Sequence, residues 1–122
     1  MKKVLFIENE EAMLAIWVEM LSFAGIETVC ATNLTEAEQM FALGGYDAIV
    51  LDACLETTST IDCLPLLANM KQTFIGPIIA ASNEEYNRAM QMAYGCTHEA
   101  KGKHTVLPIV LATLGVEFAL AA

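Results

Sequence analysis

Polar side chains that can act on a phosphoryl group stand directly after apolar runs at four places in this chain. They are the acidic cluster Glu8-Asn9-Glu10, the carboxylate Asp52, the hydroxyl Ser82 and a lysine near position 101. A carboxylate can attack phosphorus, acidic neighbours can hold a hard divalent cation through oxygen atoms, and a hydroxyl and an ammonium can bind phosphoryl oxygens. These residue types indicate charge neutralisation around a phosphoryl group on Asp52.

The run that ends on Asp52 is Tyr46-Asp47-Ala48-Ile49-Val50-Leu51. It is short, rich in branched aliphatic residues and preceded by Gly44-Gly45, which is typical of a strand buried on both faces in a parallel sheet. The carboxyl ends of such strands meet at one edge of the sheet, where open α/β sheets bind their ligands. We therefore expect Asp52 at that edge, beside the acidic cluster, Ser82 and the lysine.

Two hydrophobic periods alternate along the chain and predict five strands and five helices. Strands are predicted at 3–7, 26–31, 46–52, 78–82 and, as a weak strand, 96–100. Helices are predicted at 10–24, from the N-cap Asn33 to Gly44-Gly45, at about 61–71, at 84–94 and from about 105 onward. This alternation requires right-handed crossovers between parallel strands. The predicted fold is α/β, a doubly wound, flavodoxin-like (βα)5 three-layer sandwich with a five-stranded parallel sheet.

Length and hydropathy predict a single soluble domain over residues 1–122, with 117–122 as an apolar tail that either stays flexible or docks. The chain has 122 residues, of which 56% are hydrophobic, yet no window is continuously apolar for the length of a bilayer span. Met1-Lys2-Lys3 leads straight into a strand instead of a signal peptide. These features predict a cytoplasmic protein with no membrane partner.

Charge and cysteine usage exclude two classes of site. Six Lys plus Arg against fifteen Asp plus Glu give a net charge of -9, which repels the phosphates of nucleic acids and anionic lipids. Direct binding to nucleic acid is therefore not expected. The four cysteines, Cys30, Cys54, Cys63 and Cys96, form no CxxC pair and have no histidine at zinc spacing, so reduced and mostly buried thiols are predicted.

Over residues 2 to 116 the chain resembles a response regulator receiver domain, the phosphoacceptor module of two-component signalling. The resemblance is strongest in Val4-Leu5-Phe6-Ile7-Glu8-Asn9-Glu10 and Tyr46-Asp47-Ala48-Ile49-Val50-Leu51-Asp52. It implies a phosphoacceptor, not an enzyme, that assists its own phosphorylation and dephosphorylation. A histidine kinase or phosphotransfer protein would phosphorylate Asp52, and a downstream protein would read the signal.

The resemblance also implies the roles of the other site residues. Glu8 and Asn9 would stand at the positions of the acidic pair that, with Asp52, holds Mg²⁺. The switch hydroxyl would be Ser82, and Lys101 would contact the phosphoryl group. His98, three residues before Lys101, would be the rotating switch residue. The signal would leave through the face built by the fourth strand, the helix 84–94, the fifth strand and the last helix.

Three departures from the family pattern bear on these roles. Asn9 replaces an aspartate, which keeps an oxygen ligand but removes a negative charge, so weaker Mg²⁺ binding is predicted. The loop after Asp52 lacks the usual Pro and Gly and continues from Leu55 into Glu56 and a run of Thr and Ser, which changes its turn chemistry. Family spacing counted from Gly95 puts the lysine on Gly102. Either Lys101 follows a one-residue deletion or Lys103 follows an insertion, and the position of His98 favours Lys101.

Alternative interpretations remain for single residues. Ser82 suits the cap of a helix that begins at Asn83, and it can both cap and bind. The lysines and histidines between residues 98 and 104 can form a solvated basic patch on an acidic protein. Cys54, two residues after Asp52, is predicted to be a small buried residue instead of a redox sensor.

Three classes of function follow from these observations. The first is a stand-alone receiver whose output passes through protein contacts, with its oligomeric state left open. The second is a degenerate receiver that acts as a phosphorylation-independent interaction module, suggested by Asn9, the altered loop and the shifted lysine. The third is a flavodoxin-like cofactor binder, but Glu8-Asn9-Glu10-Glu11 would repel the cofactor's phosphate where such proteins need a Ser/Thr/Gly-rich loop.

Overall fold

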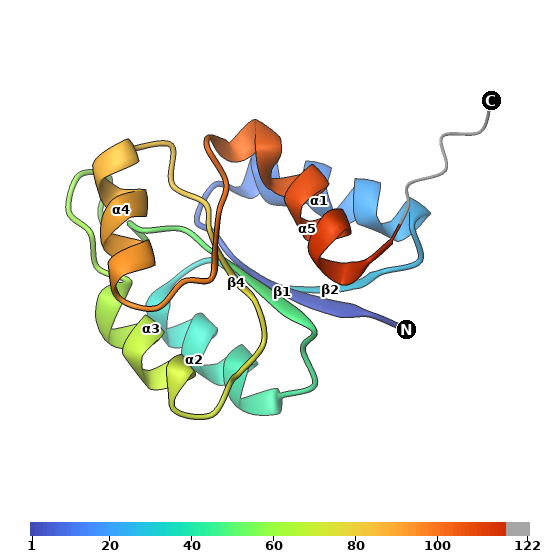
Figure 1. Cartoon of the computed structure of the whole chain (residues 1–122), viewed down its shortest axis with the longest axis horizontal. Helices are drawn as coiled ribbons and strands as arrows, with labels where there is room; N and C mark the ends of the chain where they lie inside the picture. The colour runs from blue at the N-terminus through green and yellow to red at the C-terminus, as the bar shows by residue number, and fades with distance from the viewer. Residues whose placement is uncertain (117–122) are drawn as a thin grey trace.

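The computed structural model describes residues 1–116 as a parallel sheet of five strands in the order β2-β1-β3-β4-β5, covered by helices on both faces (Figure 1). The strands are β1 Lys3–Ile7, β2 Glu27–Ala31, β3 Ala48–Leu51, β4 Ile78–Ala80 and β5 His98–Glu99. The helices are α1 Glu11–Phe23, α2 Leu34–Leu43, α3 Leu64–Lys71, α4 Glu85–Ala93 and α5 Val106–Leu114, with a short 3-10 turn, η1, at Lys103–Thr105. The predicted doubly wound α/β class is confirmed. The tail predicted over 117–122 lies outside the described residues.

Two apolar layers hold the helices to the sheet. On one face α1 and α5 pack on Val4, Phe6 and Val50, and on the other α2 and α3 pack on the alternating residues of the same strands, including Leu5. The ring of Phe6 stacks on Trp17 of α1 with centroids 5.2 Å apart. Because β1 and β3 are buried on both faces, their sequences are continuously apolar, as parallel strands require.

Most predicted boundaries agree with the structure within two residues. The N-cap of α2 is confirmed, since the Asn33 side chain accepts a hydrogen bond from the backbone N–H of Glu36 at 2.8 Å. The start of α3 differs, because Asp62 is held in a loop instead of a helix. Its carboxylate accepts from the backbone N–H groups of Leu55 and Glu56, each at 2.8 Å, so the helix begins only at Leu64.

The helix α4 differs from the other four in the chemistry of its inner face. Its two buried residues are Arg88 and Gln91. Within residues 1–116, the partly buried Met92 supplies its apolar contact with the hydrophobic core. Directional hydrogen bonds therefore contribute more to the position of α4 than to that of the other helices. This polar face lies against the ends of β3 and β4.

Two further sequence predictions concern thiols and membranes. Cys63 and Cys96 are buried, and burial raises the pKa of each thiol to about 12, so both stay protonated. Cys54 is half-buried, but Cys30 is exposed at the edge of the sheet, against the prediction for a buried thiol. No helix within residues 1–116 is long and apolar enough to cross a membrane.

Candidate functional site

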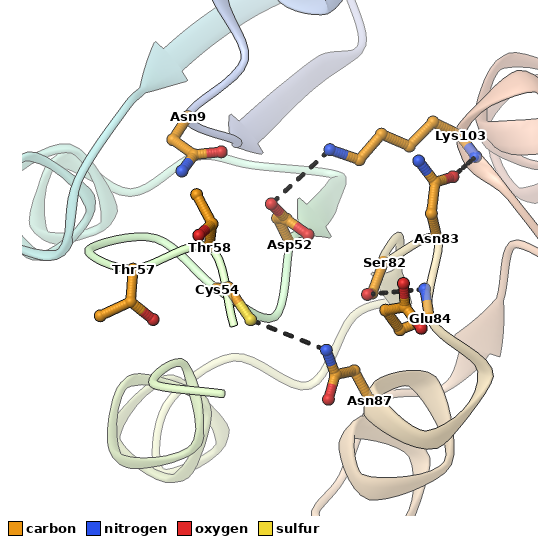
Figure 2. A pocket seen from close by; sticks show the side chains of 10 residues that line it. All are labelled: Asn9, Asp52, Cys54, Thr57, Thr58, Ser82, Asn83, Glu84, Asn87 and Lys103. Carbon is orange, nitrogen blue, oxygen red and sulfur yellow. Dashed lines mark hydrogen bonds and ion pairs between the residues drawn. The ribbon is translucent and has the colours of Figure 1, made fainter. Parts of the chain in front are cut away.

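Glu8 and Asp52 directly follow two neighbouring strands, and the sheet register brings them together. Ile7 of β1 pairs with Leu51 of β3, so the next residue of each strand projects at the same carboxyl edge. Glu8 is fully buried and Asp52 is 6% exposed. Asp52 Oδ1 accepts a hydrogen bond from the N–H of Ala53 at 2.9 Å, and Oδ2 is the oxygen that lies toward Lys103 (Figure 2).

Lys103 supplies the positive charge at this edge. Its Nζ lies 2.9 Å from both carboxylate oxygens of Glu8, 3.3 Å from Glu10 Oε2 and 3.7 Å from Asp52 Oδ2. The lysine side chain is only 11% exposed, so water screens these pairs little. One ammonium group thus forms ion pairs with two buried carboxylates and with a third carboxylate at the rim.

Burial and mutual repulsion change the protonation of the two carboxyl groups. Burial, reinforced by the Asp52 carboxylate, raises the pKa of Glu8 to about 7, although Lys103 opposes both effects. Burial also raises the pKa of Asp52, against the influence of Lys103 and the Ala53 N–H. For Lys103, burial alone would lower the pKa, but the carboxylates outweigh it and the net pKa is raised. Lys103 is therefore a permanent cation at neutral pH.

Asn9 lies at the rim of the same edge. It is exposed, and its Nδ2 donates to the carbonyl of Leu55 at 3.4 Å, which ties the residue to the loop after Asp52. Within residues 1–116 no group of three or more His, Cys, Asp or Glu side chains is arranged to hold a metal ion. The available donors are instead two carboxylates and an amide. Glu8 Oε1 is buried and accepts no well-directed hydrogen bond, so this oxygen suits a hard cation, although Lys103 already lies against it.

The prediction that Lys101 lies beside Asp52 is wrong, and the alternative of an insertion before Lys103 describes the structure. Lys101 is exposed and does not line the cavity. Gly102 has a φ of +98°, a left-handed conformation that glycine adopts readily, and its N–H donates to the carbonyl of Ala100 at 2.8 Å. This turn directs Lys103 back over the edge, where its backbone N–H donates to Asn83 Oδ1 at 2.9 Å.

His98 also lies outside the site. It is exposed on β5, and its Nδ1 is 2.7 Å from the hydroxyl of Thr97. The next residue, Glu99, faces α4 instead and pairs with Arg88, with Nε and Oε2 2.9 Å apart. A count from Gly95 points to Glu99, because that count places the lysine at 102 and the switch residue three positions before it. The sequence therefore held this signal, which the choice of Lys101 obscured.

Ser82 is placed as predicted beside Asp52, but it does not cap α4. It is 5% exposed and lines the cavity that Asp52 lines. Its Oγ accepts from the N–H of Glu84 at 3.1 Å, which stabilises the turn between β4 and the helix. The N-cap of α4 is Glu84, whose side chain makes no capping hydrogen bond. The hydroxyl hydrogen of Ser82 stays available to an acceptor in the cavity.

A cavity of about 210 Å³ joins these residues (Figure 2). Four lining residues, Thr57, Thr58, Asn83 and Asn87, were not predicted at the site from the sequence. The two threonines come from the run read only as an altered loop, and the two asparagines flank the start of α4. Cys54 lies at the same wall and accepts from Asn87 Nδ2 at 3.7 Å. Burial and nearby carboxylates raise the pKa of the Cys54 thiol, so it is not a thiolate. The lining residues are Asn9, Asp52, Cys54, Thr57, Thr58, Ser82, Asn83, Glu84, Asn87 and Lys103.

Comparison of the folded chain with solved structures gives its similarities to known proteins. No protein-family model matches it, and no curated protein is significantly similar to it. A two-component response regulator from Clostridium difficile superposes with a TM-score of 0.79 at 22% identity, over 94% of this chain and 97% of that one.

Two other solved structures carry ligands. A response regulator from Burkholderia pseudomallei, solved with a phosphorylated aspartic acid, a calcium ion and citrate, gives a TM-score of 0.79 at 19% identity over 93% of this chain and 66% of that one. The response regulator TrrA from Thermotoga maritima, in complex with Mg²⁺ and BeF, gives 0.76 at 21% identity over 94% and 98% of the two chains. The chain therefore has the fold of response regulator receiver domains, as the sequence resemblance predicted.

Proposed function

We propose that this chain is a phosphoacceptor receiver in two-component phosphorelay signalling and that Asp52 is the residue phosphorylated. The observation that supports this proposal best is the environment of Asp52. A carboxylate at the end of β3 opens into a cavity of about 210 Å³ and has a lysine ammonium 3.7 Å away and a buried serine at the same wall. A nucleophile, a cation and a hydroxyl are thus placed around a space that can hold a phosphoryl group.

In the proposed reaction, a carboxylate oxygen of Asp52 attacks the phosphorus of a phosphohistidine on a histidine kinase or phosphotransfer protein. The new O–P bond forms as the P–N bond breaks, and the imidazole leaves with the electron pair. Lys103 is placed to neutralise charge on the phosphoryl oxygens, and Ser82 can donate its hydroxyl hydrogen to one of them. The product is an acyl phosphate on Asp52.

The proposed metal site uses Glu8, Asp52 and the amide oxygen of Asn9. A bound Mg²⁺ would supply additional positive charge against the phosphoryl oxygens. Glu8 would have to exchange its contact with Lys103 for the metal, and Asn9 contributes no charge, so we propose that Mg²⁺ binds weakly in the unphosphorylated protein. A downstream protein would then read the phosphorylated state.

Intact-mass measurement tests the proposal. After incubation with a small phosphodonor and Mg²⁺, the wild type should gain the mass of one phosphoryl group and lose it on treatment with hydroxylamine, which cleaves acyl phosphates. Asp52→Asn should gain no mass. Modification that persists in Asp52→Asn would reject Asp52 as the acceptor.

A second function is favoured by specific features of the site. Lys103 already neutralises Glu8 and approaches Asp52 without a metal, and Asn9 removes a carboxylate from the proposed metal site. Both features suit a degenerate receiver that binds a partner independently of phosphorylation. A wild type that gains no mass from the phosphodonor and binds no beryllofluoride would favour this second function.

A further inference from the structure

Arg88 is a buried cation that the proposed phosphoryl chemistry does not use. It lies in the middle of α4 and is 7% exposed. Its Nη1 donates to the carbonyl of Ser82 at 3.0 Å and to that of Asn83 at 3.1 Å. Its Nε donates to Glu99 Oε2 of β5 at 2.9 Å. One guanidinium therefore joins the end of β4, the start of the helix loop and the edge strand of the sheet.

The rigid shape of the guanidinium explains why an arginine suits this place. Its donors point in fixed directions in one plane, so the carboxylate of Glu99 on one side determines where the donors on the other side point. Lysine has a single ammonium on a flexible stem and cannot hold two carbonyls and a distant carboxylate at once. The Arg88–Glu99 pair thus fixes two consecutive carbonyl groups of the loop.

The two residues whose carbonyls Arg88 holds carry side chains of the site. Ser82 lines the cavity, and its hydroxyl oxygen accepts from the N–H of Glu84. The side chain of Asn83 accepts from the backbone N–H of Lys103 at 2.9 Å. A continuous series of hydrogen bonds therefore leads from Glu99 through Arg88 to the loop and on to the lysine at Asp52.

The neighbouring residues of α4 reinforce this connection. Gln91, one turn beyond Asn87, donates to the carbonyl of Leu51 at 2.8 Å, and Leu51 directly precedes Asp52. Asn87 donates to Cys54 Sγ at 3.7 Å, two residues after Asp52. Since the inner face of α4 is polar, these directional hydrogen bonds define the position of the helix against the sheet. The position of α4 and the geometry around Asp52 are linked through them.

We propose that Arg88, oriented by Glu99, is a positioning residue that sets the location of the Ser82 hydroxyl and of Lys103 relative to Asp52. The proposal rests on the proposed function of the site as a phosphoryl acceptor. Loss of the pair releases the carbonyls of Ser82 and Asn83, the loop takes other conformations, and both phosphoryl contacts are weakened together. Since Glu99 belongs to β5, its ion pair with Arg88 connects β5 to the site.

The experiment compares Arg88→Lys and Glu99→Gln with wild type. Arg88→Lys keeps the charge but loses the planar donor set, and Glu99→Gln removes the charge that orients it. Glu85→Gln makes the same chemical change as Glu99→Gln in the exposed first turn of α4 and serves as the matched control. All four proteins are studied without metal and then with Mg²⁺ and beryllofluoride.

Amide exchange reports the loop directly and does not require phosphorylation. The N–H groups of Glu84 and Lys103 are the reporters, because they donate to the side chains of Ser82 and Asn83. In Arg88→Lys both should exchange at least about ten-fold faster, with a smaller increase in Glu99→Gln and none in Glu85→Gln. Amides of α2 should be unchanged. Unchanged reporters in Arg88→Lys, or equal acceleration in α2, would overturn the positioning role.

The affinity for beryllofluoride measures how displacement of the loop affects binding of a phosphoryl mimic at Asp52. Arg88→Lys should weaken it by about ten-fold or more relative to wild type and Glu85→Gln, since two contacts to the ligand are displaced. Wild-type affinity in both Arg88→Lys and Glu99→Gln would overturn the proposal while leaving the proposed function intact. If wild type itself binds no beryllofluoride, the proposed function fails, and the two reporter amides still decide whether Arg88 positions the loop.

Discussion

Two carboxylates stay ionised in a buried site more easily with a cation beside them, and Lys103 is that cation for Glu8 and Asp52. Its Nζ lies 2.9 Å from Glu8 and 3.7 Å from Asp52. Without it, the two carboxyl groups would share a low-dielectric site with no opposite charge. The same ammonium is placed to meet a phosphoryl group on Asp52, so one residue serves both the unmodified and the proposed modified state.

Substitution of Lys103 and of Lys101 distinguishes which of the two lysines acts at the site. Lys103→Met should reduce the rate of phosphoryl uptake from a small phosphodonor by at least about ten-fold, because a charge-assisted contact to the phosphoryl oxygens is lost. Lys101→Met, at an exposed position, should stay within about two-fold of wild type. Time courses of intact mass measure both rates. Equal effects of the two substitutions would contradict the placement of Lys103 at the site.

The neutral side chain of Asn9 leads to a prediction about Mg²⁺. Asn9→Asp adds a carboxylate at the rim and should tighten Mg²⁺ binding on the order of 1 to 2 kcal/mol if the residue is a direct ligand. Asn87→Asp is the matched control, because it adds the same charge at another wall of the cavity. Calorimetric titration of both variants gives the affinities. Equal tightening in the two would show a general effect of charge, and equal or weaker affinity in Asn9→Asp would mean that residue 9 does not face the metal.

The raised pKa of Glu8 predicts how stability changes with pH in the metal-free protein. The folded value is about 7 and the ordinary value is 4.5, so the folded state binds more protons between these pH values. This contribution to stability is therefore complete below about pH 4.5 and is lost as pH rises toward 7. The largest effect such a shift allows is about 3 kcal/mol. Asp52 changes in the same direction.

Urea unfolding of wild type and Glu8→Gln in a metal chelator tests this sign. The free energy of unfolding of wild type should fall relative to that of Glu8→Gln as pH rises from about 4.5 to 7. Glu38→Gln, on the exposed side of α2, should run parallel to wild type. A difference between wild type and Glu8→Gln that stays constant over this range would contradict the raised pKa.

Site residues at strand ends were predictable from the sequence, whereas those on loops were not. Glu8, Asp52 and Ser82 follow buried strands, and the parallel register fixes where such residues project. Lys103 depends on a left-handed turn at Gly102, and Glu99 depends on a partner in another helix. Neither the turn nor the ion pair is visible in the local sequence, although a count from Gly95 reaches position 99. Lys101 was preferred because it put His98 three residues before the lysine, and the position of Lys103 removes that reason for choosing His98.

Among the elements, hydrophobic periodicity predicted the strands and helices because each buries an apolar face. The predictions fail at α3 and α4, where polar contacts determine the start of one helix and the orientation of the other. Asp62 binds two backbone N–H groups and delays the start of α3, and α4 docks through Arg88 and Gln91. A polar residue on an inner face looks like a surface residue in sequence, so the orientation of α4 was not predictable from its pattern.

The loop between β4 and α4 is where we expect a phosphoryl signal to act. Beryllofluoride with Mg²⁺ on Asp52 should change amide exchange mainly in residues 82 to 106, with little change in 10 to 45, because Ser82 and Lys103 both lie in the first range. Ser82→Ala should still bind the mimic but damp the change, since one contact between ligand and loop is gone. Mass-resolved hydrogen exchange measures both proteins. A change centred on α1 and α2 would mean that the output face is misassigned.

For the whole molecule, net charge and metal binding affect stability together. The chain carries a net charge of -9, so any salt reduces its self-repulsion. A Mg²⁺ ion bound only by the folded state adds a specific term, about 2.7 kcal/mol at one hundred times Kd. Only the stabilisation by bound Mg²⁺ should depend on Asp52. Screening by salt acts on all charges of the protein, whereas coordination of Mg²⁺ needs a few particular oxygen atoms.

Thermal unfolding in MgCl₂ and in NaCl of equal ionic strength separates these effects. Wild type should be more stable in MgCl₂ than in NaCl, and Asn9→Asp should enlarge the difference. In Asp52→Asn the difference should shrink toward zero while the stabilisation by NaCl remains, because the substitution removes a ligand but only one of many charges. If Asp52→Asn keeps the full difference, Mg²⁺ acts at another acidic surface of the molecule. The proposed metal site at the carboxyl edge of β1 and β3 would then be rejected, whatever the chemistry of Asp52.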